Sequence, residues 1–148
     1  MTNDSYFSNE EFQEILQRYE EAQQKGLATY FDSDALADIA EYYYEEGRAN
    51  DAVDAALKGV EMFPGAMAPL VFMGRYQLLK QNNPEKAKWY LEQVDNQEEP
   101  ECIYLQAEIM LVENKQDEAD SFLRQQLEWQ EDDDRDNFIL DVTDLYLD

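Results

Sequence analysis

The sequence contains no histidine and only one cysteine among its 148 residues. The absence of histidine excludes histidine-based catalytic triads, histidine metal ligands and proton transfer by imidazole. The single cysteine, Cys102, excludes an internal disulfide and fits a reducing compartment. No glycine-rich phosphate-binding loop is present. These absences favour a protein that is not an enzyme and carries no cofactor or metal.

Basic residues are also scarce: 11 stand against 35 acidic residues, which gives a formal charge of -24. This balance argues against binding to nucleic acid or to anionic membranes, since both need clustered lysine and arginine. The excess of acidic residues favours a basic protein partner. Alternatively, the negative charge only keeps the protein soluble. The start MTNDSYFSNEEF lacks the features of a signal peptide, and no apolar run approaches a membrane span. We therefore predict a cytoplasmic protein.

Glycine and proline number only 5 and 4, and the alternating pattern of strands is nearly absent. Apolar residues instead recur at steps of three and four, the period of a helix. Ser8 and Glu11 match a capping box for the first helix, and Lys25-Gly26 ends it. Short breaks between the segments indicate antiparallel neighbours. The predicted helices are 8–25, 33–46, 49–62, 66–80, 84–94, 100–113, 116–129 and 136–147.

Small residues recur at equivalent places in successive helix pairs. The first helices carry Ala40, Gly74 and Ala107, and the second helices carry Ala52, Ala87 and Ala119. Their spacing is near 34 residues, with one extra residue in the second pair near Gln81-Asn83. Small side chains allow two helix backbones to approach closely. A repeated helix pair of this length is typical of a solenoid.

The pattern resembles the tetratricopeptide-repeat family, and the stretch YFDSDALADIAEYYYEEG with the later FPGA resembles acidic bacterial members of unassigned function. The first pair carries the motif best, with Leu36, Ile39, Ala40, Tyr43, Ala52, Ala56 and Pro64 at its spacings. The resemblance implies an all-α fold of antiparallel pairs stacked as a right-handed α-solenoid. We expect an N-terminal helix within 1–30, three pairs within 31–135 (33–65, 66–98 and 99–131), and a C-terminal helix within 136–148.

The run Tyr42-Tyr43-Tyr44 cannot form one surface, because successive helical residues point about 100° apart. Tyr43 is expected in the core, Tyr42 against a neighbouring helix and Tyr44 on the inner, concave face. That face would bind an extended peptide or a helix, or it is a solvated surface, or a terminal helix fills it. A carboxylate clamp is not expected there. The predicted lining comprises Ala37, Glu41, Tyr44, Glu45, Val71, Arg75, Leu78, Tyr104, Glu108 and Leu111.

Three functions remain open at this point. The leading one is a scaffold that binds another protein; the others are an acidic mimic of nucleic acid and a structural segment of a longer repeat protein. The helix at 136–147 is either a cap or the first helix of a further pair, with the further pair favoured, and its apolar residues make self-association a hypothesis. Asp132, Asp134 and Asp136 resemble the start of a calcium loop, but Asn137 and Thr143 stand where glycine and glutamate are required. A solvated turn explains this run better.

Overall fold

A computed structural model describes residues 4–27, 30–129, 138–139 and 141–143, and every regular element within them is an α-helix. The chain divides into two compact units, residues 1–64 (unit 1) and 65–148 (unit 2). Unit 1 contains α1 (Asp4–Phe7), α2 (Glu10–Lys25), α3 (Ser33–Glu45) and α4 (Ala49–Met62). Unit 2 contains α5 (Met67–Leu79), α6 (Pro84–Glu92), α7 (Pro100–Val112) and α8 (Gln116–Trp129).

The all-helical prediction is confirmed for the described residues, and α2 to α8 agree with the predicted ranges to within two residues. The short helix α1 was not predicted. The predicted cap of the first long helix is wrong: Asn9, not Ser8, is the N-cap residue, and its side chain accepts a hydrogen bond from the Glu11 backbone N–H at 2.7 Å. An asparagine at this position satisfies a donor that the first turn leaves unpaired. Of the predicted last helix, the described residues 138–139 and 141–143 are helical.

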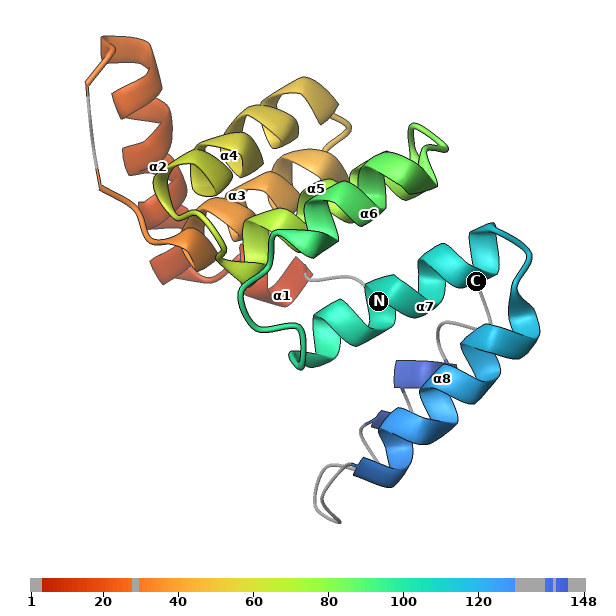
Figure 1. Cartoon of the computed structure of the whole chain (residues 1–148). Coiled ribbons are helices and arrows are strands. Elements are labelled where there is room, and N and C mark those ends of the chain that lie inside the picture. Colours follow the sequence, from red (N-terminus) through yellow and green to blue (C-terminus); the bar gives the residue numbers. More distant parts are fainter. Residues whose placement is uncertain (1–3, 28–29, 130–137, 140, 144–148) are drawn as a thin grey trace. The chain divides into compact units, whose positions relative to one another are not determined.

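Each helix pair lies side by side within its unit, as Figure 1 shows for α3 with α4 and for α5 with α6. The small residues of the pattern are buried at these pairings: Ala40, Ala52, Ala87, Ala107 and Ala119 have no exposed surface. Gly74 shows how tight the packing is. A Cβ atom there would lie 2.7 Å from Leu105 Cδ2 and 3.6 Å from the Ala87 carbonyl oxygen. The short contact is thus with Leu105 of α7, whereas the distance to Ala87 of α6 is an ordinary contact, so it is α7 that leaves no room for a larger residue at position 74.

The turns of the first and third pairs each place a left-handed residue two positions after the end of the first helix. Gly47 between α3 and α4 has a φ of 78°, and Asn114 between α7 and α8 has a φ of 61°. Both residues end their helix in the left-handed region, which glycine and asparagine tolerate best. Each stands seven residues after the buried alanine of its first helix. In the α5–α6 link the left-handed residue is Asn82, with a φ of 50°. It stands eight residues after Gly74, which is one position later than in the other two pairs. This later position agrees with the extra residue that the sequence predicts in the second pair, and the repeat itself stays a prediction.

Aromatic side chains form the core between the N-terminal helices and α3 in unit 1. The Tyr42 ring lies 5.7 Å from Phe7 and 5.8 Å from Phe12, centroid to centroid. Tyr43 is 3% exposed, and its hydroxyl donates a hydrogen bond to Glu20 at 2.9 Å. The two tyrosines thus point to different neighbours, as the helical geometry predicts. Tyr43 is in the core and the half-buried Tyr42 contacts the N-terminal helices, as predicted.

In unit 2, α7 packs against both α5 and α6. A second cluster lies on the other side of α7, where Phe138 of the C-terminal segment is 3% exposed and joins Ile103, Tyr104, Ala107 and Leu123. Val142 packs against the same cluster. The described part of the C-terminal segment is therefore a packed element of unit 2, and its residues contribute to the core around α7 and α8.

The close pairing of α3 and α4 predicts a large cost for adding volume at Ala52. Ala52→Leu should lower the free energy of unfolding by about 1–3 kcal/mol, because a fully buried site has no room for a larger side chain. Chemical denaturation measures the effect. Asn50→Leu, on the exposed surface of the same helix, is the control and should change stability by at most about 0.5 kcal/mol. Equal effects of the two substitutions would show that the pairing is not tight.

The buried tyrosines predict a loss of stability in alkali. Burial, the main cause, together with the charges of Asp54 and Asp51, raises the pKa of Tyr19 to about 12. Burial and the bond to Glu20 raise that of Tyr43 as well. Above the ordinary tyrosine pKa of about 10, the folded state holds these protons longer than the unfolded state does, so the free energy of unfolding falls as pH rises. Denaturation midpoints measured from pH 8 upward should therefore decline. The midpoint of the Tyr43→Phe variant should decline less steeply than that of the parent chain.

Candidate protein-binding surface

The predicted inner face of unit 1 lies on one side of α3. Glu41 and Glu45 are exposed, Tyr44 is half-buried, and Ala37 is buried. The positions 37, 41, 44 and 45 follow the three- and four-residue steps of one helix face. Two exposed carboxylates thus share one side of α3 with an aromatic side chain that is partly accessible. This arrangement suits contact with a cationic side chain through charge and with an apolar side chain through the ring.

The predicted lining in unit 2 divides into buried and accessible residues. Val71, Leu78 and Tyr104 are 4%, 2% and 6% exposed, so their side chains are part of the core of this unit. Arg75, Glu108 and Leu111 are partly exposed. Only these last three can contact a partner without a rearrangement of unit 2. The positions alone did not reveal this, because residues on one helix face can be covered by other elements.

Arg75 is the only basic residue of the predicted lining, and it joins α5 to α7. Its Nη1 lies 3.0 Å from a Glu101 carboxylate oxygen, and its Nη2 lies 3.1 Å from Glu108. Burial lowers the pKa of Arg75, but the charges of Glu108 and Glu101 outweigh this and raise it. The guanidinium therefore stays charged. Its two ion pairs are partly solvated, so each contributes at most about 1 kcal/mol to stability.

Glu101 was not among the predicted residues, although its position would have indicated it. It stands three residues before Tyr104 and seven before Glu108, which places the three on one stripe of α7. Glu101 and Glu108 carry two negative charges, and Arg75 compensates one of them.

Tyr104 interacts with the C-terminal segment. Its hydroxyl donates a hydrogen bond to an Asp141 carboxylate oxygen at 2.8 Å, and its ring lies 5.7 Å from Phe138. Burial, followed by the bond to Asp141 and its charge, raises the pKa of Tyr104. The C-terminal segment therefore covers this part of α7. One residue of the predicted lining, Tyr104, is thus covered by the C-terminal segment.

Cys102 is buried on α7, as predicted, with 1% of its surface exposed. Burial, with the charges of Glu99 and Glu101, raises the pKa of its thiol to about 11. The thiolate is the reactive form of cysteine, and it is scarce at neutral pH when the pKa is raised. This cysteine is a poor nucleophile in the folded protein.

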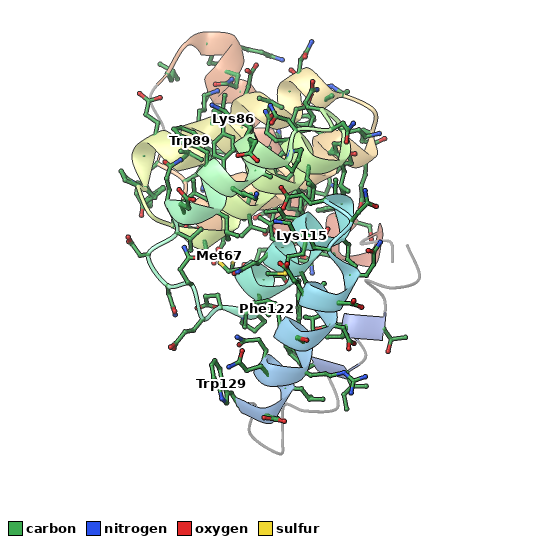
Figure 2. The ribbon with its side chains drawn as sticks, turned by 45° about the vertical axis from the view of Figure 1, so that its right-hand side comes forward. Met67, Lys86, Trp89, Lys115, Phe122 and Trp129 are labelled. Atoms are coloured by element: carbon green, nitrogen blue, oxygen red, sulfur yellow. The ribbon has the colours of Figure 1, made fainter. Side chains whose placement is uncertain are left out.

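Two exposed tryptophans lie outside the predicted lining. Trp89 on α6 is 51% exposed and Trp129 at the end of α8 is 66% exposed. Figure 2 shows Trp89 beside Lys86, whose Nζ lies 4.1 Å from the centre of its ring. Exposed tryptophans are frequent in binding surfaces. Sequence reasoning missed them because they occupy no position of the repeat motif.

Neither a metal site nor a membrane span is found in the part of the chain that the structure describes. Within it, no three cysteine, aspartate or glutamate side chains are grouped so that they could hold a metal ion. None of the helices described has both the length and the apolar character that crossing a membrane requires. The acidic run from Glu131 to Asp136, with its resemblance to a calcium loop, lies outside the described residues.

Comparison of the chain with protein-family models, with curated proteins and with solved structures found no match. The resemblance to tetratricopeptide repeats therefore stays a prediction that rests on the residues themselves.

The contact between Tyr104 and Asp141 predicts different effects for two substitutions at Tyr104. Tyr104→Phe removes only the hydroxyl and should cost about 1 kcal/mol of unfolding free energy. Tyr104→Ala empties a buried site and should cost about 3–5 kcal/mol. Chemical denaturation distinguishes them, and Asp141→Asn serves as the matched variant for the same bond. If Tyr104→Phe and Asp141→Asn add fully when combined, the two groups do not interact.

Proposed function

We propose that this chain is a non-enzymatic scaffold that binds a basic peptide or helix of a partner protein. The observation that carries the proposal is that the half-buried Tyr44 and the exposed carboxylates Glu41 and Glu45 lie on one side of α3, the side predicted to be the inner face. An aromatic anchor supplies contact area, and the flanking charges select a cationic partner. In unit 2, the accessible residues of the predicted lining are Arg75, Glu108 and Leu111, and the proposal assigns them contacts of the same type.

The proposal includes a right-handed α-solenoid of tetratricopeptide type. It is supported by three helix pairs with buried small residues, by the shared left-handed turn, and by the packing of α7 against both helices of the preceding pair. In such a solenoid the first helices of the pairs line a concave surface. A cytoplasmic location belongs to the same proposal, because a single cysteine fits a reducing compartment.

A second candidate is an acidic mimic of nucleic acid that occupies a basic protein. It is favoured by the distribution of charge, since the acidic excess is present in both units. Residues 1–64 contain 15 acidic and 4 basic residues, and residues 65–148 contain 20 and 7. Binding of this kind would be spread over many carboxylates and would weaken steeply with salt. A purely structural role within a longer repeat protein is the third candidate, and the full gene sequence tests it.

Affinity capture from a cell lysate at low and at high salt tests the proposal. We expect a defined partner that stays bound at high salt and is lost with Tyr44→Ala, or with Glu41→Lys combined with Glu45→Lys. The loss should be about tenfold or more in affinity, since truncating a central anchor costs about 2 kcal/mol. Circular dichroism checks that the variants keep their helices.

The matched control reverses two exposed acids of α4, Asp54→Lys with Glu61→Lys, and should leave the partner bound. Capture of many basic proteins that all wash off at high salt, with equal effects of both pairs of substitutions, would favour the acidic mimic instead.

A further inference from the structure

A small cavity lies in unit 2 on a part of α7 that the proposed inner face does not use. It has a volume of about 280 Å³ and is bordered by α6, α7 and the start of α8. Gln106, Met110 and Glu113 line it from α7. These residues follow a stripe that lies roughly opposite to Glu101, Tyr104 and Glu108, because each helical step turns about 100°. The cavity and the inner face are therefore separate surfaces of one helix.

The floor of the cavity is apolar. Leu91 of α6 and Ile109 of α7 are buried, and Met110 is half-buried, so aliphatic carbon and a thioether are the surfaces offered. Methionine adapts its shape to different apolar ligands. The volume is below the range of typical small-molecule sites, about 300–1,000 Å³. Its size leaves space for a large inserted side chain.

The positive charges beside the cavity are already compensated. Lys88 Nζ lies 2.7 Å from one oxygen of Glu113 and 3.5 Å from Glu85, and Lys115 Nζ lies 3.7 Å from the other oxygen of Glu113. Figure 2 shows Lys115 near the turn between α7 and α8. These contacts fix Glu113 at one end of the cavity and leave little attraction for an anion.

Two carboxylates at the rim are not compensated in this way. Glu92 and Glu118 border the cavity and are exposed, and neither makes an ion pair with a described lysine or arginine. The rim therefore has a net negative charge around an apolar floor. An occupant must offer an apolar side chain with cationic residues close to it.

From this combination we infer that the cavity is a second docking point for a basic amphipathic helix of a partner protein. One large apolar side chain of that helix enters the cavity. Glu92 and Glu118 pair with the lysines or arginines that flank this side chain. This inference does not depend on the inner face of α3. A partner that used both surfaces would gain affinity from two linked contacts.

The test uses two synthetic lysine-rich helical peptides of equal charge as probes. One has a face of leucine and tryptophan, and in the other serine and alanine replace that face. Each is added to the isotope-labelled full chain, and amide chemical shifts and affinity are measured. We expect the apolar peptide to shift the amides around Leu91, Gln106 and Met110, and to bind about tenfold more tightly than its polar counterpart.

Two sets of variants make the test specific. Glu92→Lys with Glu118→Lys should weaken the apolar peptide about tenfold, whereas the control pair Asp54→Lys with Glu61→Lys should weaken it less than about threefold. Gln106→Trp should block the cavity without a change of charge, and Gln125→Trp on the exposed surface of α8 is its control. Chemical shifts of unaffected helices verify folding in each case.

The opposite results would overturn the inference. Equal binding of both peptides, with equal effects of the two charge reversals, would show that the acidity alone attracts them. Shifts confined to α3 around Tyr44 would remove the second docking point and leave the proposed inner-face function intact. If the peptide changes amide chemical shifts at the cavity and Tyr44→Ala still captures the partner, the second docking point is supported. The proposed binding at the inner face of α3 is then contradicted.

Discussion

The close approach of two helices at a buried small residue is the constraint on which the rest of this structure depends. A larger side chain at Ala52, Ala87 or Ala119 would separate the backbones and remove contacts along both helices. Because packing, rather than intrinsic helix propensity, supplies most of the stability of helices this short, the pairs must form for the helices to persist. The position of every surface residue, including Tyr44 and Met110, follows from that pairing.

The strongly acidic composition has to be accommodated without burying charge. No described charged residue is buried, so the carboxylates lie at the surface, where water and salt reduce their repulsion. The few basic residues are placed where they act on more than one acid. Arg75 contacts Glu101 and Glu108 across two helices, and Lys88 contacts Glu85 and Glu113. The net negative charge left over lies at the surface.

Helix α7 illustrates how one element serves several purposes. One stripe binds Arg75 and the C-terminal segment, while the opposite stripe lines the cavity beside α6 and α8. The residues between these stripes, including Cys102, Leu105 and Ala107, are buried in the unit. A helix whose hydrophobic residues surround it in this way cannot be assigned a single buried face from its pattern, which explains why the sequence placed Tyr104 on an accessible surface.

The sequence by itself determined most of the local features: the ranges of α2 to α8 to within two residues, the burial of the small residues, and the separate directions of Tyr42 and Tyr43. These follow from period, capping and side-chain volume, which act over a few residues. Only the tertiary structure decided which residues of a face stay accessible. Phe138 and Asp141 cover Tyr104 from more than thirty residues away, and the cavity joins residues of three helices. Contacts between segments so distant in the chain depend on the packing of whole helices, and no local pattern encodes them.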